Sequence, residues 1–156
     1  MKVATSGRQS TAPRHTRKMR IRPIEERDTE AVVALWEAAG LTRPWNDPRK
    51  DIARKLEVQR ELFLVGEVDA RVVATAMAGY DGHRGWVNYL AVDPAHRGAG
   101  HGRALMHEIE RLLAERGCPK LNLQVREGND GALAFYRALG YDVDVVASLG
   151  KRLIPD

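Results

Sequence analysis

The sequence predicts an α/β (α+β) domain in which helices pack on a mixed, mostly antiparallel sheet. Two observations carry this prediction. Residues 62–68 and 71–80 are two strand-like runs separated by only two residues, which is typical of an antiparallel hairpin. Further along, a strand pattern at 85–92, a long helical pattern from about 100 to 116 and a strand pattern at 120–125 follow one another. That order is typical of a β-α-β crossover, which joins parallel strands.

The first part of the chain is predicted to form a short strand and two helices. Residues 19–22, MRIR, alternate in polarity and stop before a proline. Asp28 suits the N-cap of a helix that Gly40 would end. The apolar face of that helix is Val32, Leu35, Trp36 and Ala39. After the loop LTRPWN, Asp47 is expected to cap a second helix that begins with a proline.

The second part continues with strands and then alternates helix and strand. Asp69 and Ala70 form the expected tight turn of the hairpin, and the turn DGHR leads into the strand at 85–92. A shorter helix is expected at 129–139, stopped by a glycine, and residues 141–146 are expected to begin a last strand or hairpin. The predicted order is therefore β-α-α-β-β-β-α-β-α-β, without an internal repeat.

The charge of the chain is concentrated at its N-terminus. The 156 residues carry a formal net charge of +4, with 25 basic and 21 acidic residues. Six of the basic residues and no acidic residue lie within positions 1–20, which leaves 19 basic residues against 21 acidic ones in the remainder. We expect residues 1–18 to form a disordered basic extension and residues 19–156 to form one domain.

Composition also excludes several classes of function. The single cysteine, Cys118, rules out an internal disulfide framework and favours a reducing, cytoplasmic location. The cysteine and the five scattered histidines show no metal-ligand spacing, so no metal is expected. No apolar run approaches the roughly 18 residues of a membrane span, so no membrane partner is expected. Because the predicted domain is slightly acidic, nucleic acid is not expected as a partner.

The segment Arg97-Gly98-Ala99-Gly100-His101-Gly102 stands between a strand and the long helix. Each glycine weakens a helix by about 1 kcal/mol relative to alanine, so their presence at a helix start needs a reason. Binding of an anion would explain them, because a helix N-terminus presents unpaired N–H groups and the positive end of the helix dipole. A P-loop is excluded because Arg103 and an alanine follow the last glycine, and the dinucleotide fingerprint fails because its third glycine would fall on Arg103.

Two motifs in register resemble the GCN5-related N-acetyltransferases (the GNAT family). NYLAVDPAHRGAGHGRALM, residues 88–106, resembles the strand, coenzyme A loop and helix of that family, and NDGALAFYRALGY, residues 129–141, resembles its later signature. With the element order, the resemblance covers residues 19–153. It implies about six to seven strands with a central parallel pair splayed to admit coenzyme A, about four flanking helices, and acetyl-CoA as co-substrate.

The resemblance also implies roles for particular residues. Tyr136 would protonate the departing sulfur of coenzyme A, although a purely structural role beside Phe135 is the alternative reading. The family's carboxylate base has no counterpart in GWVNY, so Asp81, His83, Glu127 and a water chain stay open as proton acceptors. The residues that would contact the cofactor are Leu90, Ala91, Val92, Arg97, Gly98, Ala99, Gly100, His101, Gly102, Arg103 and Asn129.

The acceptor is expected to meet two loops. One is the loop LTRPWN, where Arg43, Trp45 and Asn46 would form an amphipathic wall, and the other is the turn that contains Asp81 and His83. An exposed Trp45 would bind acceptor, whereas a buried one would cover the core. Direct transfer of the acetyl group to a primary amine in a ternary complex is the leading prediction. A non-catalytic acyl-CoA-binding domain is the alternative, and neither the amine nor a homodimer partner is specified by the sequence.

Overall fold

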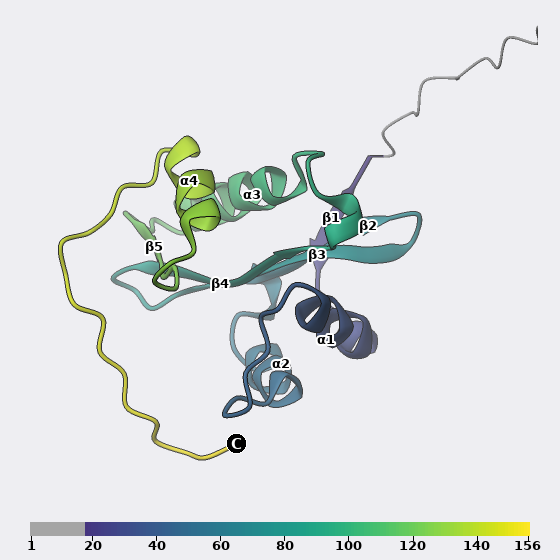
Figure 1. Cartoon of the computed structure of the whole chain (residues 1–156), viewed down its shortest axis with the longest axis horizontal. Helices are drawn as coiled ribbons and strands as arrows, with labels where there is room; N and C mark the ends of the chain where they lie inside the picture. Colours follow the sequence, from purple (N-terminus) through teal and green to yellow (C-terminus); the bar gives the residue numbers. More distant parts are fainter. Residues whose placement is uncertain (1–17) are drawn as a thin grey trace, which may run out of the picture.

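Five strands form one sheet in the order β1-β2-β3-β4-β5, with helices on both faces (Figure 1). The computed structural model describes residues 18–156. The expected extension at 1–18 therefore lies outside the described residues except for its last residue. The elements are β1 Arg20–Pro23, α1 Thr29–Ala38, α2 Pro48–Leu56, β2 Phe63–Val68, β3 Arg71–Tyr80, β4 Gly85–Val92, α3 His101–Glu115, β5 Leu121–Leu123 and α4 Asp130–Ala138.

The strand pairing confirms the mixed sheet. Strands β1 to β4 pair antiparallel with their neighbours, and β5 pairs parallel with β4. Asp69 and Ala70 both have positive φ, 53° and 59°, which is the geometry of the two-residue turn predicted for the β2–β3 hairpin. The crossover from β4 through α3 to β5 is the expected β-α-β unit.

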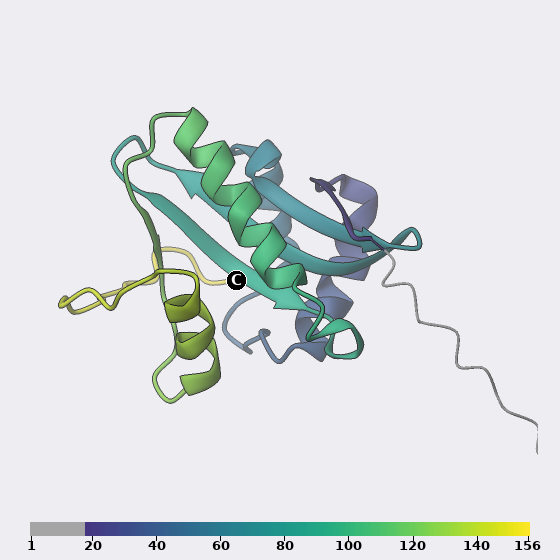
Figure 2. The ribbon, with the colours of Figure 1, turned by 90° about the horizontal axis from the view of Figure 1, so that it is seen from above.

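Two apolar cores lie on opposite faces of the sheet. Helix α3 runs across one face, as Figure 2 shows, and buries four side chains against the strands. On the other face α1 and α2 bury a second cluster around Trp36, which is fully buried, and Ile52. The four side chains of α3 are Leu105, Met106, Ile109 and Leu113. The helical spacing of apolar residues is therefore what seats each helix on its face of the sheet.

A buried charge network fixes the first strand. The Arg22 guanidinium donates to both carboxylate oxygens of Asp28, at 2.7 and 2.8 Å, and to Glu67 Oε1 at 2.6 and 2.8 Å. Hydrogen bonds from Arg22 hold the pKa of Asp28 below its usual range. The predicted helix-capping role of the Asp28 side chain is wrong, because its carboxylate binds Arg22 and the N–H of Glu25 instead.

The last predicted strand is wrong. Residues 141–146 form no strand, so the described sheet has five strands instead of six to seven, and the parallel pair lies at one edge of it. The alternation of valine and aspartate in this segment matches a strand, but a strand also needs a partner for its backbone groups. The segment makes an exposed side-chain contact instead, Lys120 Nζ to Asp144 at 2.8 Å, and Gln124 contacts Ser148 just beyond it.

The remaining caps and ends agree with the predictions. Asp47 caps α2 by accepting from the N–H of Arg49 at 2.9 Å, with Pro48 at the first helical position. Gly40 has a φ of 72° and follows α1. Within residues 18–156, no helix has the length and apolar character needed to cross a membrane.

Candidate active site

Strand β4 contains a bulge at Tyr89. Thr75 of β3 pairs with Ala91 and Met77 pairs with Asn88, so two residues of β4 lie opposite one residue of β3. Tyr89 has a φ of 52°, in the left-handed region that favours glycine. A non-glycine residue held there costs roughly 1–3 kcal/mol, and such strain is found most often at functional sites.

A buried hydrogen-bond chain holds Tyr89 in this conformation. Trp36 Nε1 donates to Thr75 Oγ1 at 2.9 Å, and the Thr75 hydroxyl donates to the Tyr89 carbonyl at 2.9 Å. The Tyr89 ring also stacks on Trp36, with centroids 3.7 Å apart and planes 8° apart. Thr75 is fully buried, and its hydroxyl is the hydrogen-bond partner of both the buried Trp36 N–H and the partly buried Tyr89 carbonyl.

Beyond the bulge, one edge of β4 is open. Pairing with β5 covers only Gly85 to Val87, and no strand among the described residues pairs with 88–92 on that side. This open edge includes Leu90, Ala91 and Val92, of which Ala91 is buried and the other two are half-buried. An exposed strand edge offers backbone N–H and C=O groups to an extended ligand.

The glycine loop follows β4 and ends at the start of α3. Gly98 and Gly100 each have a φ of 81°, so both need glycine for their backbone conformation. Helix α3 has no side-chain cap and no acidic residue in its first turn. Its hydrogen-bond ladder begins with Ala104 N–H to Gly100 O at 3.0 Å, so the N–H groups of residues 101–103 precede it.

The loop's side chains leave this helix end positively charged and accessible. Arg97 and Arg103 are exposed on either side of it, Ala99 is exposed, and His101 is the first helical residue. Gly102 has a different reason to be glycine. A Cβ there would lie 3.3 Å from Phe135 Cζ, so its small size also serves the contact between α3 and α4.

Tyr136 lies in a large cleft of about 1900 Å³ together with Leu90 and Asn129. Burial raises the pKa of the Tyr136 phenol to about 12, so the hydroxyl is protonated at neutral pH. Its ring packs edge-on against Phe135, with centroids 5.1 Å apart. Asn129 Oδ1 caps α4 through the N–H of Ala132 at 3.1 Å, which leaves its side-chain NH₂ group to donate elsewhere. The glycine loop does not line this cleft.

Arg43 and Asn46 face one another across a tight turn in the loop before α2. The Asn46 N–H donates to the Arg43 carbonyl at 3.1 Å, and the two residues form an isolated antiparallel bridge. Trp45 is 60% exposed at the tip of this turn, so it does not cover the core. All three residues line the same cleft as Tyr136.

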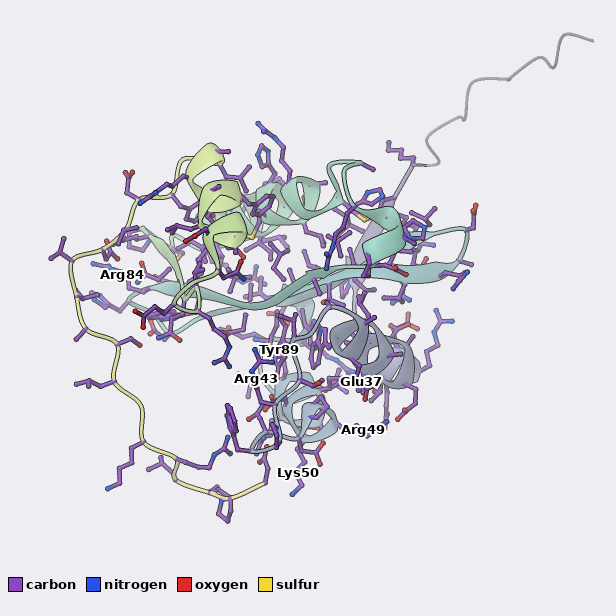
Figure 3. The ribbon with its side chains drawn as sticks, viewed as in Figure 1. Glu37, Arg43, Arg49, Lys50, Arg84 and Tyr89 are labelled. Atoms are coloured by element: carbon purple, nitrogen blue, oxygen red, sulfur yellow. The ribbon has the colours of Figure 1, made fainter. Side chains whose placement is uncertain are left out.

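Asp51 and Tyr89 also belong to this cleft, although the sequence does not single them out. The Tyr89 hydroxyl donates to Asp51 Oδ2 at 2.6 Å, and Asn46 Nδ2 donates to the Tyr89 oxygen at 2.9 Å and to Asp51. Burial and the adjacent Asp51 raise the pKa of Tyr89 above its usual value. Figure 3 shows Tyr89 and Arg43 in the space between the sheet and α2. The only signal in the sequence is a second aspartate one turn after Asp47.

The structure does not bring Asp81 and His83 to this cleft. Asp81 Oδ1 accepts from the N–H groups of His83 at 2.8 Å and Arg84 at 2.7 Å, which shapes the β3–β4 turn. Those backbone hydrogen bonds, the one from Arg84 first, lower the pKa of Asp81. Glu127 is exposed and likewise absent from the cleft lining.

The cleft and the loop beside it thus combine three chemical capacities. An open strand edge can bind an extended amide-containing arm, a positively charged helix start can bind an anion, and a protonated phenol can donate to a developing negative charge. On the other side of Tyr89, Asp51 and Arg43 offer two opposite charges to a second molecule.

Comparisons with known proteins agree with this geometry. The model of the Acetyltransferase (GNAT) family matches residues 25–141. An acetyltransferase of Yersinia pestis (strain Pestoides F) is 51% identical over 138 residues, covering 88% of this chain and 98% of the relative. The ribosomal-protein-S18-alanine N-acetyltransferase from Escherichia coli superimposes with a TM-score of 0.67 at 28% identity, covering 79% of this chain and 77% of that one.

A third comparison is with a structure that contains coenzyme A. The PaiA N-acetyltransferase from Thermoplasma acidophilum in complex with coenzyme A superimposes with a TM-score of 0.67, covering 83% of this chain and 93% of that one. At 16% sequence identity this likeness shows the fold alone.

Replacing Thr75 by valine should destabilise the protein markedly. The change keeps the side-chain shape but leaves the Trp36 N–H and the Tyr89 carbonyl without partners, at about 1–3 kcal/mol for each. Thr75→Ser keeps the hydroxyl and loses one methyl group, worth about 1 kcal/mol. Chemical denaturation should therefore rank the variants wild type, serine, valine. A valine variant as stable as the serine variant would show that the hydroxyl does not hold the bulge.

Proposed function

Because the chain belongs to the acetyltransferase (GNAT) family, we propose that it transfers the acetyl group of acetyl-CoA directly to a primary amine bound in the same cleft. The observation that carries this proposal is the open edge of β4 beyond Tyr89, which leads into the glycine loop and, at Leu90, shares a cleft with the half-buried Tyr136. The E. coli relative is named as an alanine N-acetyltransferase, so the acceptor in its name is also an amine.

The residues present fit acetyl-CoA. The pantetheine arm would lie along Leu90, Ala91 and Val92 and pair with their backbone groups as an added strand does. The pyrophosphate would lie at the glycine loop, where the uncapped N–H groups of residues 101–103 and the side chains of Arg97 and Arg103 can receive negative charge. The side-chain NH₂ group of Asn129 would donate to the arm from the other side.

The chemistry follows from the placement of two substrates. The amine nitrogen attacks the thioester carbonyl carbon, the new N–C bond forms, and the C–S bond breaks with its electron pair moving to sulfur. Holding both substrates in attack geometry supplies much of the acceleration. The Tyr136 hydroxyl donates a hydrogen bond to the sulfur as its charge develops. An acceptor that binds as an ammonium loses one proton to water before the attack and a second one after the N–C bond forms; Asp81, His83 and Glu127 do not line the cleft.

The test of this function is release of coenzyme A from acetyl-CoA in the presence of a panel of amines. Direct transfer predicts release only when an amine is present, and no acetyl adduct on the protein after incubation with acetyl-CoA alone. A non-catalytic acyl-CoA-binding domain would bind acetyl-CoA and release nothing with any amine. A stable acetyl-protein adduct that an amine then discharges would contradict direct transfer.

Replacing Gly100 by valine should weaken acetyl-CoA binding by more than tenfold. Valine is strained at a φ of 81° and would place branched atoms where the pyrophosphate approaches. Gly117→Val is the matched control, because Gly117 has a φ of 78° beyond the opposite end of the same helix and a Cβ there would meet no atom within 4 Å. Titration calorimetry should show lost affinity only at position 100; equal affinity for both folded variants would remove the loop from the cofactor site.

Replacing Tyr136 by phenylalanine should lower kcat roughly 100-fold, which is the usual effect of removing a positioned general acid. The affinity for acetyl-CoA should be unchanged. Because the phenol pKa is raised to about 12, its proton is retained as the pH rises and is lost only near that value. The ratio of wild-type to variant kcat should therefore stay constant between about pH 7 and 10. A ratio that falls by half near pH 10 would show an ordinary phenol pKa, and a ratio near one would remove Tyr136 from the reaction.

A further inference from the structure

We propose that the acetyl acceptor is an amino acid or a similar zwitterion, with Asp51 binding its ammonium group and Arg43 binding its carboxylate. This inference rests on the proposed function, which requires an amine but does not say what else the acceptor carries. Four observations support it: a carboxylate held by hydrogen bonds, a guanidinium without an ion pair among residues 18–156, the loop that links the two residues, and their shared cleft.

Asp51 is a carboxylate held rigidly at the cleft. Its Oδ2 accepts from the Tyr89 hydroxyl at 2.6 Å and from Asn46, and the Asp51 side chain is 20% exposed. Its Oδ1 accepts from Arg54 at 3.0 Å. Arg54 also binds Asp156 at 3.0 Å, and Arg152 lies 3.8 Å from the same Asp156 carboxylate. Arg54 binds the Oδ1 side of Asp51, whereas the donors on Oδ2, Tyr89 and Asn46, are neutral, so Oδ2 is the side that a cation in the cleft would meet.

Arg43 is the complementary cation. Its Nη1 donates to the carbonyls of Gly40 at 2.9 Å and Thr42 at 2.8 Å, which fixes the guanidinium in the loop. No carboxylate among residues 18–156 forms an ion pair with it. By contrast, Arg152 donates to Asn46 Oδ1 at 3.0 Å and lies 3.8 Å from Asp156. Arg43 thus has positive charge and free N–H donors suited to a planar carboxylate.

The loop links Arg43 and Asp51 through Asn46, and both residues line the same cleft. Arg43 lies opposite Asn46 in the antiparallel bridge, and Asn46 contacts both Asp51 and the Tyr89 hydroxyl. Arg43 therefore comes from this turn, and Asp51 comes from α2, the helix that follows it. A ligand that carries an amine and a carboxylate near each other can meet both, whereas a polyamine would leave Arg43 facing a like charge.

The test compares amino acids with their primary amides, which keep the amine and replace the carboxylate by a neutral group. Coenzyme A release at saturating acetyl-CoA gives kcat/KM for each. The amine of an amide is less basic, so intrinsic reactivity at neutral pH favours the amide. We expect the wild-type protein to reverse this and to prefer the acid by about tenfold or more, the scale for a hydrogen bond between charged groups.

Substitutions assign the two halves of the site. Arg43→Gln should lower kcat/KM for the acid by about 10- to 100-fold and leave the amide unchanged, while Arg43→Lys keeps the charge and should keep part of the preference. Asp51→Asn should raise the KM for acid and amide by the same factor. Arg49→Gln is the control, because Arg49 is exposed and pairs with Glu30. Melting temperature and acetyl-CoA affinity, measured for each variant, separate lost recognition from lost folding.

The outcomes distinguish this inference from the function on which it rests. Amine-dependent release with no preference for acids, or a preference that survives in Arg43→Gln, would overturn the zwitterion site and leave acetyl transfer intact. If no acid, amide, polyamine or peptide supports release, the proposed function itself is wrong. The inference is supported if the protein prefers the amino acid over its amide, the Arg43→Gln variant loses this preference, and the Arg49→Gln variant keeps it.

Discussion

The left-handed backbone of Tyr89 is the constraint on which the rest of this site depends. Three contacts hold Tyr89 in this conformation. The Thr75 hydroxyl donates to its backbone carbonyl, the Trp36 ring stacks on its ring, and the Asp51 carboxylate accepts from its phenol hydroxyl. These contacts come from β3, α1 and α2, so the bulge ties both N-terminal helices to the sheet. Their combined contribution offsets the strain of a non-glycine residue at a φ of 52°.

The bulge also divides the cleft into its two halves. Past Tyr89, the edge of β4 has no neighbouring strand among the described residues and leads to the glycine loop and the start of α3. The Tyr89 side chain lies on the other half, where it meets Asn46 and Asp51. A single residue therefore separates the edge proposed for the acetyl-CoA arm from the charged groups proposed for the acceptor, which is how two substrates can meet at one carbon atom.

Features with a local signal could be predicted from the sequence. The hairpin turn at Asp69 and Ala70, the Asp47 cap and the helical stripe of α3 depend on neighbouring residues, and all three are confirmed. The glycine loop stands out in the sequence because closely spaced glycines weaken a helix start, and an anion-binding role explains their presence there. The predicted site roles of its residues stay predictions.

Features that depend on distant partners could not be predicted. Asp51 meets Tyr89 across 38 positions, and only the folded chain shows that α2 faces the bulge. Asp28 matches a helix cap locally, but Arg22 and a buried setting take its carboxylate. The segment 141–146 alternates as a strand does and yet finds no ladder partner. In each case the local sequence pattern is compatible with more than one structure, and contacts with residues far away in the chain decide which one forms.

Hydrogen–deuterium exchange with and without acetyl-CoA tests the central claim most directly. If the bulge opens β4 for the cofactor, acetyl-CoA should slow exchange at the amides of residues 88–92 and 98–103. The paired residues of the β2–β3 hairpin, which already have backbone partners, should exchange at the same rate with or without it. Protection of residues 98–103 without any change at 88–92 would contradict the account, because the cofactor would then bind without using the edge that Tyr89 exposes.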